Sequence, residues 1–114
     1  MVVRSERRAD RVFYALSDPT RRDIVRRTGG EGQSVSTLAG HYPMSFAAVQ
    51  KHVAVLERAG LVTKHSRGRE RIVRSNTEAI RHARDLLGQL EEVWRARIER
   101  FGEALYSNEE GTRT

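Results

Sequence analysis

The 114-residue sequence contains no cysteine, and this absence excludes disulfide bonds, thiolate catalysis and cysteine-based metal sites. No apolar run approaches the roughly 20 residues that a membrane-spanning helix requires. The N-terminal stretch MVVRSERRADR also lacks the apolar core of a secretory signal. From these absences we expect a soluble cytoplasmic protein that has no membrane partner.

Residue patterns of common active sites are also missing. The sequence shows no activated nucleophile, no phosphate-binding glycine loop and no paired acid site. Glu91 and Glu92 lie beside Arg95 and Arg97, an arrangement typical of a solvated helix face with ion pairs. Gly68 in the stretch GRERIV is typical of a turn. We therefore expect no enzymatic activity and no cofactor.

Basic residues are abundant and unevenly distributed. Residues 1–76 contain 15 Lys and Arg against 7 Asp and Glu, whereas residues 77–114 contain 6 against 8. The difference gives the first part +8 and the second part −2, which sum to the net charge of +6. This split indicates that the first two thirds of the chain face a polyanion, with a merely solvated basic surface as the alternative.

Helical spacing of apolar residues predicts two helices in the first 28 residues. Ser5 is the expected N-cap of the first, which is about three turns long and ends at residues 17–18. Asp18 is then placed to cap a second helix that starts at Pro19, where a missing N–H does no harm. Gly29 and Gly30 are expected to end it, and GGEGQS at 29–34 reads as a flexible connection. A short helix over about 36–41 follows.

The stretch MSFAAVQKHVAVLERAGLV at 44–62 predicts a longer helix with defined ends. Ser45 can accept a hydrogen bond from the N–H of Ala48, and Gly60 can close the helix in a left-handed conformation. An inward apolar stripe recurs at helical spacing at Val49, Val53 and Leu56. The opposite face carries Phe46, Ala47, Gln50, Lys51 and Ala54. The short helix, the break and the capped helix together predict a helix-turn-helix.

Two short strands, at about 62–66 and 71–75, are predicted around a turn at Gly68. This hairpin is strongly basic, with one acidic residue, Glu70, beside Lys64, Arg67, Arg69, Arg71 and Arg74. Such a hairpin suits contact with DNA phosphates. The expected fold is therefore mostly α with a small β-hairpin, a winged helix-turn-helix with about five helices and a two-stranded wing.

From Thr77 a last helix is expected to run to about residue 106. Its apolar stripe comprises Ile80, Ala83, Leu87, Leu90, Trp94, Ile98, Phe101 and Leu105. At roughly 40 Å this helix is longer than the diameter of about 30 Å expected for a compact body formed by residues 1–76. Part of its apolar stripe must therefore meet another surface, and a second copy of the chain is the simplest partner. An intramolecular helix across its own core is the alternative. We expect a single domain over 1–106 and a disordered tail over 107–114.

At this point the sequence resembles the ArsR-type winged-helix transcriptional repressors of bacteria and archaea. The resemblance covers about residues 13–101. It depends on FYALSDPTRRDIV at 13–25, SVSTLAGHYPMS at 34–45, AAVQKHVAVLERAGLV at 47–62 and GRERIVRSN at 68–76. It implies a homodimer that binds a palindromic operator and blocks its promoter. The implied parts are a dimerisation helix over 1–17, a helix-turn-helix and wing over 18–76, and a second dimerisation helix over 77–106.

The resemblance also assigns roles to individual positions. Together with the basic hairpin, it gives the expected DNA-binding residues Ser45, Phe46, Ala47, Gln50, Lys51, Lys64, Arg67, Arg69 and Arg71. Together with the apolar stripes of the first and last helices, it gives the expected dimer-interface residues Val12, Phe13, Leu87, Leu90, Trp94 and Phe101. Phe46 is unusual, and either a contact with a thymine methyl group or packing onto the core would explain it. Gln50 can read adenine, and Lys51 is expected to meet a phosphate.

Metal-sensing members of this family carry ligands that the sequence does not have. Their cysteine pair is replaced here by Val35, Ser36 and Thr37. In the last helix His82 stands alone, because Val93 occupies the position of the second histidine. His52 is expected to pack and form a hydrogen bond and not to bind metal. We therefore expect a member without a metal site.

Two other functions remain as alternatives. A winged-helix scaffold for protein interaction or dimerisation would keep the fold without specific DNA binding, although it would have no reason to keep arginines at the hairpin tip. RNA binding fits less well, because a recognition helix suits the wide major groove of B-DNA and not the narrow one of A-form RNA. The expected partners are thus double-stranded DNA and a second copy of the chain.

Overall fold

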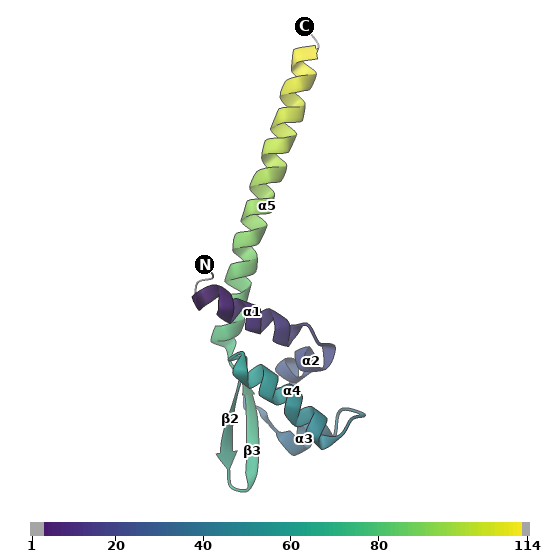
Figure 1. Cartoon of the computed structure of the whole chain (residues 1–114), viewed down its shortest axis with the longest axis vertical. Helices are drawn as coiled ribbons and strands as arrows, with labels where there is room; N and C mark the ends of the chain where they lie inside the picture. The colour runs from purple at the N-terminus through teal and green to yellow at the C-terminus, as the bar shows by residue number, and fades with distance from the viewer. Residues whose placement is uncertain (1–3, 113–114) are drawn as a thin grey trace. The chain divides into compact units, whose positions relative to one another are not determined.

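The computed structural model describes residues 4–112, and its side chains from residue 7 to residue 106. Five helices and three strands follow one another along the chain (Figure 1). They are α1 (Arg4–Leu16), α2 (Pro19–Arg27), β1 (Gln33–Ser34), α3 (Val35–Ala39), α4 (Phe46–Arg58), β2 (Val62–Arg67), β3 (Glu70–Ser75) and α5 (Thr77–Thr112). The mostly helical fold with a basic hairpin agrees with the sequence prediction.

The chain divides into two compact units, Met1–Ala83 and Arg84–Thr114. The first unit contains every element from α1 to the first two turns of α5, and the second contains the remainder of α5. Side chains from Gly88 to Tyr106 are all exposed, which leaves this part of α5 without core residues of its own. The expected single domain over residues 1–106 stays a prediction.

The ends of the first helices follow from local chemistry. Asp18 accepts a hydrogen bond from the backbone N–H of Arg21 at 3.0 Å, and Pro19 occupies the first position of α2, as predicted. The prediction for Ser5 is wrong, because α1 already begins at Arg4 and Ser5 lies inside the helix. The short helix α3 is also shifted toward the N-terminus, since Ser34 caps it through the N–H of Thr37.

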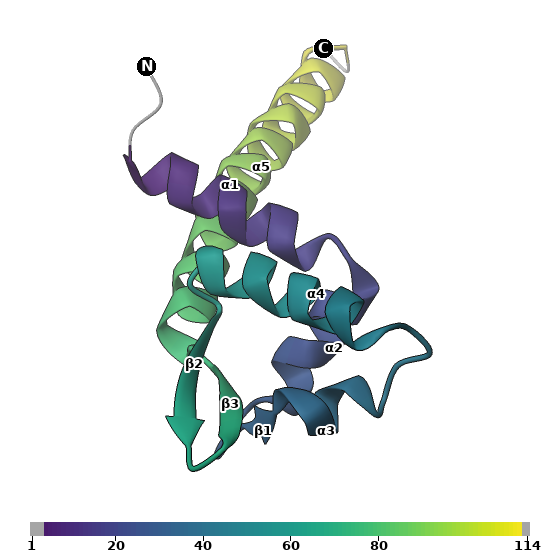
Figure 2. The same cartoon turned by 60° about the horizontal axis from the view of Figure 1, so that its bottom comes forward.

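The core of the first unit is built around α4, which contacts α1, α2, α3 and β2 (Figure 2). Its inward stripe is buried as predicted, at Val49, Val53 and Leu56. The other elements contribute their own buried side chains to the same cluster: Val12, Ala15, Ile24, Val35, Leu38, Leu61, Val62, Val73, Ala79 and Ala83. Burial of this apolar surface holds α4 against the rest of the unit.

The sheet has three strands in the order β1–β3–β2, and not the two strands that were predicted. The additional strand β1 pairs antiparallel with β3, with Gln33 opposite Val73 and Ser34 opposite Ile72. Gly32 permits this pairing: its φ is +84°, and a Cβ atom there would lie 2.4 Å from the carbonyl oxygen of Val73. The glycine-rich connection at 29–34 therefore leads into a close backbone packing that no other residue type fits.

The last helix is longer than expected. Residues 107–112 continue α5, so the prediction of a disordered tail is wrong for them, while Arg113 and Thr114 lie outside the described residues. No proline interrupts the chain after Thr77. Because a helix that has already formed gains a hydrogen bond with each added residue, residues of modest helix propensity can continue it. Within residues 4–112, no helix is both long and apolar enough to cross a membrane.

Candidate nucleic-acid interface

The N-terminal half of α4 presents a solvent-exposed face made of the residues predicted to contact DNA. Ser45 caps the helix and accepts a hydrogen bond from the N–H of Ala48 at 3.1 Å, as predicted. Phe46, Ala47, Gln50 and Lys51 are all exposed. They share one side of α4 because residues three and four apart lie on the same helix face. The first two turns therefore offer a free edge of the size that enters a major groove.

Phe46 lies toward solvent. Its side chain is 47% exposed, whereas the neighbouring Met44 packs on the core cluster. The structure thus favours the alternative in which the ring is available to a partner over the one in which it folds onto the core. An exposed aromatic ring at the start of a groove-facing helix suits a contact with a thymine methyl group.

The loop before α4 is anchored to α2 by a tyrosine. The hydroxyl of Tyr42 donates to Asp23 Oδ2 at 2.7 Å, and Arg27 Nε donates to the same oxygen at 2.7 Å. These two hydrogen bonds hold the pKa of the Asp23 carboxyl below its ordinary value. Burial, followed by the hydrogen bond to Asp23, raises the pKa of Tyr42 to about 12. The anchor fixes where the recognition helix begins.

A buried arginine connects the three helices α1, α2 and α4. Arg21 of α2 is 9% exposed and donates from Nε to the carbonyl oxygen of Ala15 at 2.7 Å and from Nη2 to that of Tyr14 at 3.2 Å. Its Nη1 lies 3.3 Å from Nδ1 of His52 in α4. The prediction that His52 packs and forms a hydrogen bond is confirmed. Arg21 itself was not singled out, because nothing in the sequence separates it from the other arginines.

The C-terminal end of α4 also forms as predicted. Leu61 donates its N–H to the carbonyl of Leu56 at 3.0 Å, Gly60 donates to that of Glu57 at 3.0 Å, and Gly60 has a φ of +76°. This is a Schellman motif. Asn76 then donates its N–H to the carbonyl of Leu61 at 2.8 Å, which fixes the end of β3 beside the end of α4. The wing is therefore held in a defined position relative to α4.

The wing is a regular antiparallel hairpin of β2 and β3, closed by a two-residue loop. Arg67 pairs with Glu70 at its tip, and Gly68 supplies the positive φ of +61° that the loop requires. The tip arginines Arg67, Arg69 and Arg71 are exposed as predicted. Lys64 is only partly exposed, because its Nζ lies 3.6 Å from a carboxylate oxygen of Glu57. Its charge is therefore partly balanced within the protein.

Helix and wing meet in a hollow of about 300 Å³. Gln50 lines it from α4, Lys64 from β2 and Arg71 from β3, and Val35 and Val53 complete the lining. Lys64 and Arg71 share one face of the hairpin, because Lys64 pairs with Val73 and Arg71 pairs with Ser66 in the same alternation. One amide side chain and two cationic side chains thus converge from separate segments of the sequence.

The predicted dimer-interface residues fall into two groups. In the second unit, Leu87, Leu90, Trp94 and Phe101 are all at least half exposed, and Trp94 reaches 63%. In the first unit, Phe13 packs on the core cluster. Val12 is only 1% exposed within one chain, so it is a core residue and its assignment to the interface is wrong. The 3.6-residue spacing of apolar side chains does not distinguish a stripe buried in the core of its own chain from one that contacts a partner chain.

Metal ligands are not gathered anywhere in the described part of the chain. Between residues 4 and 112 no group of three or more His, Asp or Glu side chains could hold an ion. His82 lies in α5 within the first unit, and His52 is engaged with Arg21.

Comparison with known proteins identifies proteins that are similar to this chain in sequence and fold. A helix-turn-helix domain family matches residues 16–65. An ArsR-like transcriptional regulator from Rhodococcus sp. RHA1 superposes with a TM-score of 0.74 at 33% sequence identity, covering 84% of this chain and 91% of that chain. The transcriptional repressor SdpR of Bacillus subtilis is 33% identical over 57 residues, which are 50% of this chain and 63% of that repressor. The chain thus matches less than two thirds of that repressor's length.

A more distant structure agrees in fold. The homodimeric winged helix-turn-helix DNA-binding domain of Mycobacterium bovis, determined in solution, gives a TM-score of 0.61 at 20% identity. The alignment covers 81% of this chain and 89% of that chain. At this level of identity the likeness concerns the arrangement of helices and strands alone.

Proposed function

Because the chain belongs to the ArsR family of winged helix-turn-helix transcriptional regulators, we propose that it is a repressor that binds a palindromic operator in double-stranded DNA as a homodimer. This role would place it in the cytoplasm, with the chromosome of a bacterium or archaeon. The hollow between α4 and the wing carries the proposal, since Gln50, Lys64 and Arg71 converge there. A protein-interaction scaffold would have no reason to gather an amide and two cationic side chains beside a hairpin whose tip carries exposed arginines.

The exposed side chains divide into those that read bases and those that hold the backbone. Gln50 can donate to and accept from the edge of an adenine in the major groove, and Phe46 can contact a thymine methyl group. Ser45 and Lys51 at the same helix edge are suited to phosphates, as are the wing arginines Arg67 and Arg69. The backbone contacts would supply most of the affinity, and the helix contacts would supply the sequence preference.

A homodimer is supported by the second unit. Its helix presents exposed apolar side chains at helical spacing, and such a face is stable in water when a partner covers it. A symmetric pair would carry two recognition helices, which suit two half-sites about 34 Å apart in successive major grooves. A palindromic operator follows from this symmetry.

The proposal is tested by selecting a bound duplex from a random pool and measuring its affinity by fluorescence anisotropy over a range of salt concentrations. Gln50→Ala should cost about 1–3 kcal/mol on the selected duplex and nothing on duplexes changed at the base that Gln50 reads. Arg69→Ala should weaken all duplexes alike and reduce the slope of log Kd against log salt by about 1.

Arg95→Ala is a suitable control, because Arg95 is an exposed arginine of α5 that pairs with Glu91 at 2.7 Å and lies outside the proposed interface. It should leave both affinity and salt slope unchanged. If Gln50→Ala and Arg69→Ala behaved identically across operator variants, the division into reading and holding residues would be wrong. If no duplex were selected at low salt, DNA binding itself would be excluded.

A further inference from the structure

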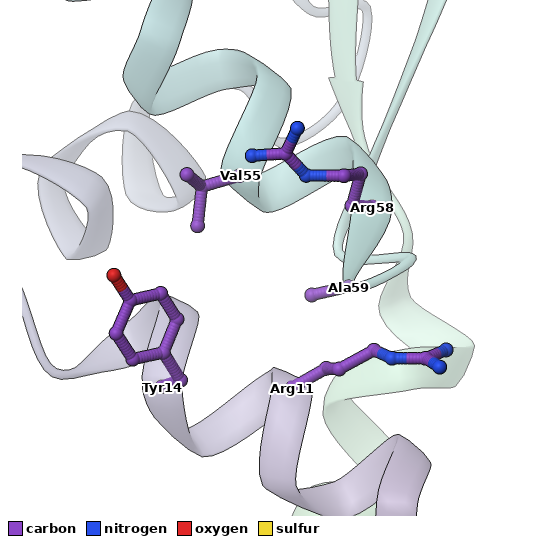
Figure 3. Close-up of a pocket in the computed structure, with 5 residues that line it drawn as sticks. All are labelled: Arg11, Tyr14, Val55, Arg58 and Ala59. Carbon is purple, nitrogen blue, oxygen red and sulfur yellow. The ribbon is translucent and has the colours of Figure 1, made fainter.

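A second concave surface lies at the other end of α4, lined by α1, the last turn of α4 and the start of α5. It consists of two adjoining hollows of about 490 and 770 Å³ that share Arg11, Arg58 and Ala59. We call it the arginine cleft, and its principal residues are Arg7, Arg8, Arg11, Tyr14, Val55 and Arg58. Figure 3 shows Arg11 and Tyr14 projecting from α1 opposite Val55 and Arg58 of α4.

The cleft concentrates uncompensated positive charge. None of its four arginines forms an ion pair with any side chain between residues 7 and 106. Glu57 also lines the larger hollow, but its carboxylate is 3.6 Å from Lys64 of the wing. Four guanidinium groups in one concave site repel one another and attract a negatively charged ligand. Their planar donors match carboxylate and phosphate groups.

The rest of the lining indicates what accompanies the negative group. Tyr14 offers an aromatic ring that is 66% exposed, and Val55 offers an aliphatic surface opposite it. Hollows of several hundred Å³ with an apolar wall and a few charged groups are of the size that holds small molecules. The lining thus fits a ring or short hydrocarbon that carries an anionic group.

DNA is a poor candidate for this site. The cleft contains Arg58, the last residue of α4, whereas the proposed DNA face begins at Phe46, the first. Twelve residue steps along a helix separate these two positions by roughly 18 Å. The cleft therefore lies about three helical turns away from the residues of α4 that are proposed to enter the major groove.

Contacts lead from the cleft to the recognition helix. The Tyr14 ring lies 5.3 Å from Cζ of Arg21, in a cation–π arrangement. Arg21 holds the carbonyl of Tyr14 and lies 3.3 Å from Nδ1 of His52 in α4. A ligand that moves Tyr14 therefore alters the contacts of Arg21, and Arg21 also contacts α4 through His52.

We propose that the arginine cleft binds a small organic anion, a carboxylate or phosphate with an aromatic or short aliphatic part, and that its binding changes the affinity of α4 for DNA. The second half of this inference rests on the proposed function, and the first half does not. The cleft is then the site through which a metabolite regulates the repressor.

Binding is tested on the full chain without DNA, by following backbone amide NMR signals during titration with phenyl phosphate, benzoate and inorganic phosphate. The expected result is saturable binding with shifts concentrated at Arg11, Tyr14 and Arg58. The two aromatic anions separate a phosphate requirement from a carboxylate one, and inorganic phosphate should bind at least tenfold more weakly than phenyl phosphate. The double substitution Arg11→Gln and Arg58→Gln should weaken binding at least tenfold.

Arg69→Gln at the wing tip is the matched control and should leave these affinities unchanged. Both variants keep the core intact, which unchanged amide spectra elsewhere would verify. Shifts centred on the wing or on residues 45–51, or an affinity indifferent to the double substitution, would overturn the site. No saturable binding of either aromatic anion would overturn it as well.

Regulation is tested separately, by measuring DNA affinity with and without saturating phenyl phosphate for the native chain and for His52→Ala, which removes the contact between Arg21 and α4 without changing the lining of the cleft. The native chain should change its Kd for the selected duplex at least fivefold, and His52→Ala should lose that change while still binding the anion. An unchanged Kd in the native chain would overturn regulation and leave the binding site standing. A chain that binds the anion but no duplex would refute the proposed function alone.

Discussion

The buried side chain of Arg21 in α2 connects this helix to α1 and α4. Arg21 satisfies two carbonyl groups at the end of α1 and contacts His52 of α4. Its removal would leave the buried carbonyl of Ala15 without a donor, which is more costly than the loss of the hydrogen bond itself. We predict that Arg21→Ala lowers the free energy of unfolding by about 1–3 kcal/mol, measured by urea denaturation.

Arg22→Ala provides the comparison at the next position. Arg22 also donates to a carbonyl of α1, that of Leu16 at 2.8 Å, but its side chain is exposed. Water can replace that donor, so Arg22→Ala should change the urea midpoint little. Equal effects of the two substitutions would show that burial of Arg21 does not matter.

The carboxyl of Asp23 gives stability a dependence on pH. Its pKa is lowered in the folded chain by hydrogen bonds from Tyr42 and then Arg27, from an ordinary value of 3.8. A lowered folded pKa stabilises the protein above pH 3.8, and that contribution is lost as the pH falls through the folded value. Asp18 acts in the same direction, through the backbone N–H of Arg21 and the charges of His52 and Arg21.

We therefore predict that the urea midpoint of the native chain falls below pH 3.8. Asp23→Asn should show a smaller fall between neutral pH and that range, because one of the two carboxyls no longer titrates. Tyr42 acts in the opposite direction: its pKa is raised from 10.0 to about 12, so its contribution is present below pH 10 and is lost as the pH rises toward 12. If the urea midpoint of Asp23→Asn fell with acid as much as that of the native chain, Asp23 would not contribute to the pH dependence of stability.

Two glycines set the ends of elements, and they should differ in what they tolerate. At Gly60 a Cβ atom would meet nothing within 4 Å, and the cost of Gly60→Ala is that of a left-handed conformation, about 1 kcal/mol. At Gly32 the same atom would lie 2.4 Å from the carbonyl oxygen of Val73, so β1 would have to separate from β3.

We predict that Gly32→Ala destabilises the chain more than Gly60→Ala does, as measured by thermal unfolding. Gly29→Ala is the control, since its φ is not positive and the nearest atom would be 3.9 Å away, an ordinary contact. It should be neutral or slightly stabilising. An equal loss at Gly32 and Gly60 would mean that the pairing of β1 with β3 contributes nothing.

Elements with strong end signals could be predicted from the sequence, and elements without them could not. Asp18 and Ser45 each place a side-chain acceptor at the N-cap position, and Gly60 follows the apolar stripe of α4. The starts of α2 and α4 and the end of α4 were therefore predicted closely. The strand β1 has two residues, too few to show any alternation, and its glycines resembled those of a flexible loop. Its formation depends on β3, some 40 residues away.

The candidate sites follow the same rule. The outward face of α4 and the tip of the wing were predicted because their residues lie together in sequence. The arginine cleft was not, because Arg11 and Arg58 belong to helices that only the fold brings together. Val12 was misassigned for a related reason, because an apolar residue at this position suits both the core of the chain and an interface with a partner chain.

At the scale of the whole molecule, the exposed apolar face of the second unit should determine the oligomeric state. Trp94 is its largest side chain, and removal of a central tryptophan from an interface typically costs 2 kcal/mol or more. We predict that Trp94→Ala raises the dimer dissociation constant at least about 30-fold, measured by sedimentation equilibrium, with little change in the unfolding of the first unit.

Glu103→Ala is the control for this prediction. Glu103 lies nine residues beyond Trp94, which places it on the opposite side of the helix at about 100° per residue. It should leave the dimer unchanged. A dimer that is equally stable with and without the tryptophan would place the interface elsewhere.

Sedimentation of the native chain with its selected duplex measures DNA binding and the symmetry of the complex in one experiment. We expect a complex of two chains and one duplex, formed when both half-sites are present and weakened steeply as salt rises. A chain that sediments alone beside the free duplex in dilute buffer, or that binds as one copy, would refute a homodimeric repressor.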